Sequence, residues 1–249
     1  MDDSIAIGEL ERIVRADPTA LPELRDQIEA RLASDDPNER MDAGRALRVA
    51  ATEDPELVGP YEEILVELLA AENDSLRLSG AIGVAEIAGI NPDRVRGVAP
   101  QLIDVLAETN APSLQEALLR SLTRIATVDP AAVAPADPIV ADRLPEATYS
   151  IKTVVTRSFV DVVRAEPRLF DETIGAYMTV IQSNSEPIAG FAVEALAEIA
   201  AADPSALPPL EPIRDRIEEL EAKIDADPRP NIRVDVKQAI QALQEVETG

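Results

Sequence analysis

The sequence lacks the side chains on which most enzyme and metal sites depend. Its 249 residues contain no cysteine, no histidine and no tryptophan. Without thiols there is no disulfide framework and no thiolate chemistry. Without imidazole the common zinc sites and the Ser-His and Cys-His catalytic pairs are excluded. A catalyst built from carboxylates alone, or a Ca²⁺ or Mg²⁺ site, stays open, but the composition favours a non-catalytic protein with no cofactor and no metal.

Aromatic residues and long apolar runs are also scarce. Aromatics make up 2% of the chain although 46% of it is hydrophobic, so the core must consist of Ala, Leu, Ile and Val. Such residues suit close helix–helix packing. No apolar stretch approaches the roughly 20 residues that cross a bilayer, and the acidic first residues, MDDSIAIGEL, do not resemble a secretory signal. We therefore expect a cytoplasmic protein without a membrane segment.

Basic residues are few, and lysine is the rarest of them. The chain has 47 acidic and 23 basic residues, a net charge of −24, and its only lysines are Lys152, Lys223 and Lys237. High acid with little lysine is typical of proteins from salt-loving archaea. At about 1 M salt the Debye length is about 3 Å, which screens the self-repulsion of such a chain. The composition thus indicates a halophilic, archaeal protein; the alternative is that the acidity serves a basic partner.

An acidic or amide residue followed by proline recurs along the whole chain. The pair occurs at 17–18, 54–55, 91–92, 129–130, 166–167 and 203–204, always 37 or 38 residues apart. Periods of about 20 to 50 residues indicate repeat architectures. The pattern predicts a single domain, 1–249, with a capping helix in 1–16 and six units at 17–53, 54–90, 91–128, 129–165, 166–202 and 203–246.

Each unit is predicted to form two helices. Asp or Asn before proline is a typical helix N-cap, with proline at the first helical position. A second proline follows in five units and should kink or restart the first helix. A polar turn then leads to an alanine-rich second helix with apolar residues at helical spacing. Since no segment alternates like a strand, we expect an all-α fold.

The second helices resemble those of the HEAT-repeat family. The resemblance rests on stretches such as RMDAGRALRVAA and IAGFAVEALAEIA, with Arg40, Arg77 and Arg233 at the family's arginine position, and it covers nearly the whole chain. It implies a right-handed α–α superhelix, a HEAT-repeat solenoid, whose second helices line the concave face. The function it implies is a protein-binding scaffold or adaptor. Two alternatives from the same family are a chromosome-associated regulatory subunit of SMC-type complexes and an accessory or lyase-like enzyme.

The last unit departs from the period because an insertion lengthens its first helix. Within it, Ile213, Ile217, Leu220 and Ile224 follow a short heptad pattern. Repeat arrays need terminal caps, so a long cap on a monomer is the favoured interpretation. The alternative is a dimer that pairs through residues 213–224.

Charge is divided unevenly between the two helices of a unit. The first helices carry a large excess of acid, whereas the second helices are close to neutral. Aligned by the repeat period, Arg45, Arg120 and Arg157 share one column, and Arg48 and Arg164 lie on the same helical stripe. Guanidinium groups suit carboxylates, so these arginines are candidates for binding an acidic segment of a partner. The alternative is that they pair with acids of the neighbouring repeat.

Tyr149 completes the set of candidate binding residues. It starts a second helix and is the aromatic residue that we expect to be exposed, as anchors of interfaces often are. The expected partner is another protein that offers an acidic or extended segment. Nucleic acid is disfavoured by the net charge of −24, because affinity for a duplex comes mainly from neutralising its phosphates.

Overall fold

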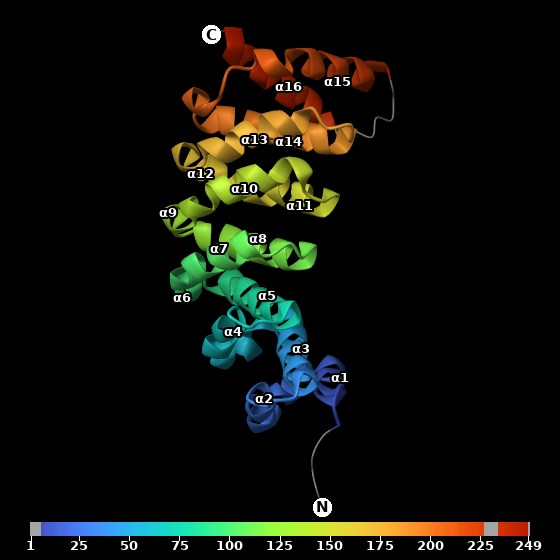
Figure 1. Cartoon of the computed structure of the whole chain (residues 1–249). Coiled ribbons are helices and arrows are strands. Elements are labelled where there is room, and N and C mark those ends of the chain that lie inside the picture. The colour runs from blue at the N-terminus through green and yellow to red at the C-terminus, as the bar shows by residue number, and fades with distance from the viewer. Residues whose placement is uncertain (1–5, 227–233, 249) are drawn as a thin grey trace, which may run out of the picture. The chain divides into compact units, whose positions relative to one another are not determined.

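The computed structural model describes residues 6–226 and 234–248, and over these residues the chain forms helices and turns without a strand (Figure 1). The prediction of an all-α fold is therefore confirmed. No helix in this described part is long and apolar enough to cross a membrane. Residues 1–5 of the expected cap, and Arg233 of the family motif, lie outside the described residues.

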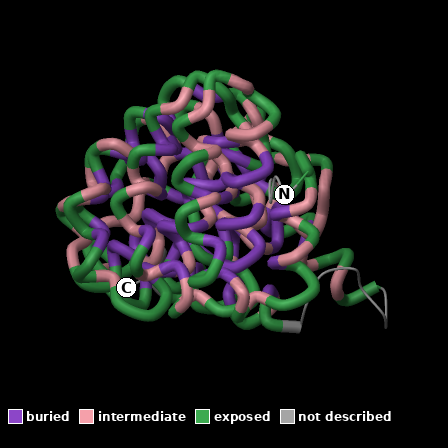
Figure 2. The backbone as a smooth tube through the Cα atoms, turned by 90° about the horizontal axis from the view of Figure 1, so that it is seen from below, coloured by how far each residue is buried: buried purple, intermediate pink, exposed green. Residues whose placement is uncertain are grey.

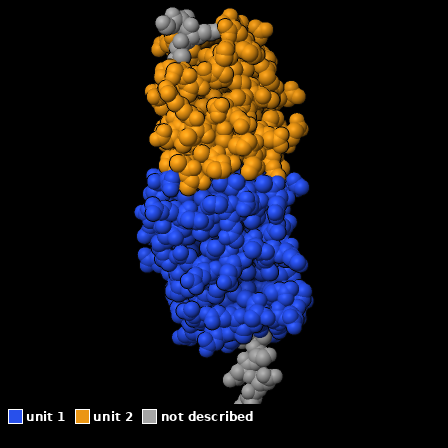
Figure 3. Space-filling model, turned by 60° about the vertical axis from the view of Figure 1, so that its left-hand side comes forward, with its two compact units in different colours: residues 1–129 blue, residues 130–249 orange. Residues whose placement is uncertain are grey.

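The chain consists of two compact units, residues 1–129 and 130–249 (Figure 3). The division falls between Asp129 and Pro130, where the sequence pattern also begins a new repeat. A single domain over 1–249 stays a prediction.

Unit 1 contains a leading helix and three helix pairs. The α-helices are α1 (Glu9–Ala16), α2 (Arg25–Leu32), α3 (Pro37–Glu53), α4 (Glu62–Leu68), α5 (Asp74–Ile90), α6 (Pro92–Val95), α7 (Ala99–Glu108) and α8 (Pro112–Ala126). The second helices pack in order, α1 on α3, α3 on α5 and α5 on α8, and each first helix packs on its own second helix.

Unit 2 continues the same pattern. Its α-helices are α9 (Pro130–Val133), α10 (Asp137–Arg143), α11 (Tyr149–Val154), α12 (Val160–Ala165), α13 (Asp171–Ile181), α14 (Glu186–Ala202), α15 (Arg214–Ala226) and α16 (Val234–Thr248). A π-helical turn, Val155–Phe159, joins α11 to α12. The second helices again pack in order, α12 on α14 and α14 on α16.

The prolines shape the first helices as the sequence predicts. The stretches Pro18–Leu24 and Pro55–Tyr61 are 3₁₀ turns, and the α-helix begins only after the second proline. The side chains of Asp17, Asp54 and Asp203 accept hydrogen bonds from the second backbone N–H that follows each of them, so these residues are N-caps. Asn91 has the same extended backbone but makes no side-chain cap, and the prediction is wrong there.

The residues at the family's arginine position hold the turn between the two helices of a unit. Arg40 donates to the Ser34 carbonyl at 2.5 Å, and Arg77 donates to the Ala71 carbonyl at 2.5 Å. Gln115, which replaces the arginine in the next unit, makes the equivalent bond at 2.9 Å. In these three units a long side-chain donor at this position reaches a carbonyl six residues upstream.

Small residues and buried side chains form the core. Buried residues lie where helices face one another, and exposed residues cover the outside (Figure 2). Gly80 on α5 illustrates the close packing, because a Cβ atom there would lie 2.5 Å from the carbonyl oxygen of Leu65 on α4. The two fully enclosed tyrosines, Tyr61 and Tyr177, donate their hydroxyls to the carbonyls of Leu21 and Val155 at 3.1 and 3.0 Å.

The heptad pattern of the last unit serves its own core. Ile213, Ile217 and Leu220 are 5% exposed or less, and Ile224 is half-buried. Because these side chains already pack inside unit 2, they do not form a free seam. Their burial favours the internal, capping role of this segment, and a dimer through 213–224 stays a prediction.

Candidate partner-binding surface

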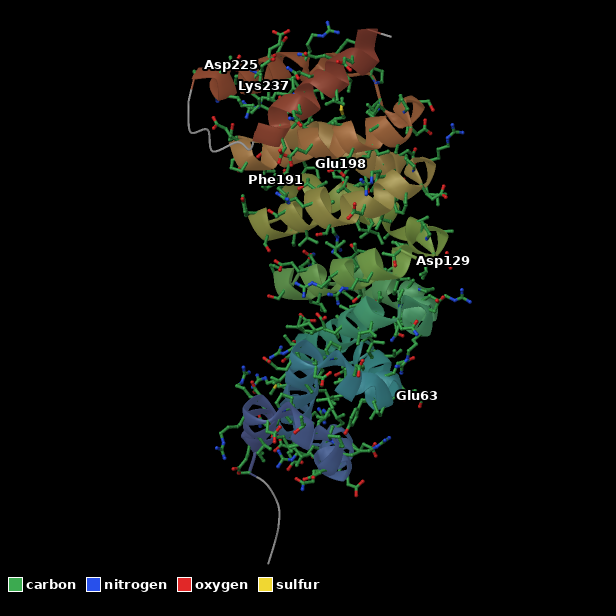
Figure 4. The ribbon with its side chains drawn as sticks, turned by 180° about the vertical axis from the view of Figure 1, so that it is seen from behind. Glu63, Asp129, Phe191, Glu198, Asp225 and Lys237 are labelled. Atoms are coloured by element: carbon green, nitrogen blue, oxygen red, sulfur yellow. The ribbon has the colours of Figure 1, made fainter. Side chains whose placement is uncertain are left out.

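In each unit the second helices form a layer, and every candidate residue lies on the layer of its own unit. In unit 1 this layer consists of α1, α3, α5 and α8, and in unit 2 of α11, α12, α14 and α16. Figure 4 shows Phe191 and Glu198 along α14 in this layer, whereas the exposed Glu63 belongs to the first helix α4. The outer faces of the first helices carry exposed acids, which include Glu23, Asp26, Glu63, Asp93, Asp104 and Asp171.

Two of the candidate arginines are paired with acids of a neighbouring repeat. The guanidinium of Arg120 on α8 lies 3.6 Å from the carboxylate of Glu86 on α5, which also pairs with Arg124 at 2.9 Å. Arg164 on α12 lies 2.8 Å from Asp161 and 3.6 Å from Glu198 on α14. These contacts match the inter-repeat pairing that the sequence left as an alternative.

Arg45 and Arg48 form a second group. Neither makes an ion pair or a side-chain hydrogen bond among the described residues of the chain, although both lie half-buried on α3. Arg48 lines a hollow of about 240 Å³ together with Arg15, Val49, Thr52, Glu53 and Ile82. Arg15 at the end of α1 is itself paired with Glu11 at 2.7 Å.

The hollow places like charges near one another. Burial lowers the pKa of Arg48, the charges of Arg45 and Arg15 lower it further, and only Glu11 opposes them. Arginine stays charged in proteins, so the lowered pKa indicates a cation that is poorly solvated and only partly compensated by the Glu11 carboxylate. An anion that reached Arg48 would relieve both effects.

Arg157 lies on the π-helical turn of unit 2 and is oriented by an aromatic ring. Its guanidinium carbon sits 4.9 Å from the centre of the Phe191 ring on α14. A cation stacked on an aromatic face keeps its N–H edge free for a planar anion. Arg157 is exposed and makes no ion pair within the part of the chain that the structure describes.

Tyr149 is 57% exposed at the first position of α11. Among the six tyrosines and phenylalanines it is the most exposed, as expected. Phe159 and Phe170, in contrast, lie in the core and contact each other edge to face, with their ring centres 5.7 Å apart. Phe191 is half-buried beneath Arg157.

Sequence reasoning missed three contributors to this surface: Arg15, Ile82 and Phe191. Ile82 occupies the arginine column, and a break in that column was the only signal that the position differs. Arg15 lies in the leading helix, which has no partner unit to align with, and Phe191 looked like an ordinary core residue. In each case the contribution to the surface depends on side chains of the neighbouring repeat.

The surface carries no arrangement suited to a metal ion. Within residues 6–226 and 234–248, no group of three or more acidic side chains is placed to hold one. The second helices present guanidinium groups, which suit anions, and the apolar side chains of Ile82 and Tyr149.

Comparisons with known proteins give the fold. No protein-family model matches the sequence, and no curated protein matches it. The structure is similar to the crystal structure of an engineered protein, with a TM-score of 0.68 and 18% identity over 91% of this chain and 96% of that one. It is also similar to the archaeal HEAT-like repeats protein from Thermococcus onnurineus NA1, with a TM-score of 0.56 and 16% identity over 99% of this chain and 100% of that one.

The paired helices, the 37-residue period and this full-length similarity agree. The chain has the all-α fold of HEAT-like repeat proteins.

Proposed function

We propose that the protein is a non-catalytic scaffold that binds acidic, extended segments of a partner protein on the second-helix layers of its two units. The proposal is supported by one observation above others. Arg45, Arg48 and Arg157 have no carboxylate partner among the described residues, in a chain with 47 acidic and 23 basic residues. Where acids are in such excess, an arginine that stays without one is available to a ligand.

The contrast with other arginines supports this assignment. Arg12, Arg25 and Arg94 each reach a carboxylate of their own helix or of the adjacent repeat within 2.7 Å. Exposed pairs of this kind contribute little to stability, typically about 0.2–1 kcal/mol each. They do occupy the guanidinium groups, however, and leave the unpaired arginines on the second-helix layer as the open sites.

The acidic outer faces of the first helices favour the same direction of binding. Like-charge repulsion disfavours an acidic segment on those faces and leaves the second helices, which are close to neutral. In the repeat architecture each unit contributes a few contacts to such a segment. A halophilic, cytoplasmic setting remains part of the proposal, because it would screen the net charge of −24.

The test is a binding titration with a fluorescein-labelled glutamate-rich peptide, measured by anisotropy. We expect the triple variant R45Q/R48Q/R157Q to lose at least about tenfold in affinity, the loss of one charge-assisted contact or more. The matched control R25Q/R96Q/R168Q removes the same charge from the first-helix side and should bind like the wild type.

Equal weakening by both triple variants would show that only net charge matters and would refute the proposal. A labelled DNA duplex of the same length serves as a second probe. Tighter binding of that duplex than of the peptide would contradict a protein partner and would favour the chromosome-associated alternative.

A further inference from the structure

The hollow at Arg48 has two kinds of wall. Val49 of α3 and Ile82 of α5 provide an apolar surface, and Arg15 and Arg48 lie beside it. Arginine stems are themselves apolar up to the guanidinium group. The hollow therefore combines an apolar floor with a positively charged edge. A carboxylate group alone would leave the apolar part unfilled.

The size of the hollow suits one large apolar side chain. Its volume is about 240 Å³, whereas a cavity of about 150 Å³ lined by apolar residues accommodates a benzene ring. A leucine or phenylalanine side chain would therefore fit and leave room for the arginine stems to adjust.

The charges along α3 fix where an acid can lie relative to that side chain. Arg45 and Arg48 lie on the side toward the start of α3, and Glu53 lies at the other end of the hollow. A carboxylate near Glu53 would be repelled. At about 1.5 Å per helical residue, Arg48 and Thr52 are about 6 Å apart along the axis, which an extended peptide spans with about two residues.

We propose that the hollow receives one leucine- or phenylalanine-sized side chain of a partner segment, while Arg45 and Arg48 bind carboxylates about two residues from it. The inference rests on the proposed function and specifies its partner as an acidic segment with an apolar anchor. The anchor would also retain affinity in concentrated salt, because apolar burial is not screened as charge pairs are.

Two labelled peptides test the inference: a short glutamate-rich peptide with a single central leucine, and the same peptide with serine in its place. Wild-type protein should bind the leucine peptide at least about tenfold more tightly, as expected for burial of much of a leucine side chain. Raising the KCl concentration should weaken the serine peptide more than the leucine peptide.

Filling the hollow should abolish the preference. Thr52 is exposed at its edge, so T52W should bind both peptides alike with the affinity of the serine peptide. The control is T127W, because Thr127 is exposed at the equivalent position of the repeat, at the C-cap of α8 and outside the hollow, and it should keep the preference. Circular dichroism establishes that both variants fold. As an independent test, I82S removes part of the apolar wall and should reduce the preference for the leucine peptide over the serine peptide.

The outcomes separate the two proposals. If both peptides bind wild-type protein equally, or if T52W and I82S both keep the leucine preference, the hollow is not an anchor site, although the arginine surface stands. If neither peptide binds, the proposed function fails and this inference fails with it.

Discussion

Asp137 is a buried carboxylate that joins two repeats of unit 2. It lies on α10, is 4% exposed, and accepts hydrogen bonds from the backbone N–H groups of Glu172 at 3.0 Å and Thr173 at 2.8 Å. These groups belong to the first turn of α13, where N–H donors have no partner within the helix. Asp137 thus caps a helix of the next repeat, and D137A should destabilise unit 2.

The expected loss for D137A is about 3 kcal/mol. A hydrogen bond to a charged group contributes about 1.5–3 kcal/mol, and two are lost here. Removing the carboxylate also removes the cost of burying its charge. The lower end of the summed range for two hydrogen bonds, about 3 kcal/mol, is therefore expected. The matched control is D203A, because Asp203 caps its own 3₁₀ turn through Ser205 at 3.1 Å near the surface. Loss of this single N-cap near the surface should cost clearly less than D137A.

Urea unfolding followed by circular dichroism measures both changes, and hydrogen exchange measured by mass spectrometry locates them. D137A should speed exchange in α13 selectively, whereas D203A should affect the start of the last repeat. If D137A costs no more than D203A, or if α13 keeps its protection, the carboxylate does not connect the two repeats and the reasoning is wrong.

Three further outcomes follow from the same contacts. Burial raises the pKa of Tyr177, above the value of about 10 expected in the unfolded chain. The protonated Tyr177 hydroxyl therefore stabilises the fold fully below about pH 10, and this contribution is lost as the pH rises further. Y177F should reduce the loss of thermal stability at alkaline pH. A melting temperature that depends on pH in the same way in Y177F and wild type would contradict this prediction. R120E should lower the melting temperature, because it places a second negative charge beside Glu86. R157E should lose affinity for the peptide with little change in melting temperature. The opposite result for the two variants would contradict a structural role for Arg120 and a binding role for Arg157. Helicity should fall on dialysis from molar KCl into dilute buffer, because 24 net negative charges are then unscreened, and a helicity equal in both would count against the halophilic interpretation.

The repeat punctuation made most of the fold predictable from the sequence. An acid or amide before proline marks where each first helix begins, and the second proline marks where its 3₁₀ turn gives way to an α-helix, as at Pro22 and Pro60. Both effects are local, since they depend on the missing N–H and fixed φ of proline. The π-helical turn at Val155–Phe159 was not predictable, because it coincides with a tertiary hydrogen bond from Tyr177 to the Val155 carbonyl.

The binding surface was predictable only in part. Helical spacing alone put Arg45, Arg120 and Arg157 on second helices, but it does not distinguish paired from unpaired arginines. That distinction depends on acids of the next repeat, such as Glu86 beside Arg120, and on the ring of Phe191 beneath Arg157. The roles of Asp42 and Asp137 were missed for the same reason, since each accepts backbone N–H groups across a repeat boundary, Asp42 from Glu11 at 3.2 Å and Asp137 from Thr173 at 2.8 Å.

The most direct test of the central claim is photo-cross-linking of the serine-bearing glutamate peptide to defined positions, because a bulky group at position 52 would fill the hollow that a leucine anchor needs. A benzophenone side chain is placed in separate variants at the exposed Thr52 and Tyr149 of the second helices, and at the exposed Glu63 and Asp171 of the first helices. We predict efficient cross-links from positions 52 and 149 and only background from positions 63 and 171. Equal or stronger cross-linking from the first-helix positions would contradict the account.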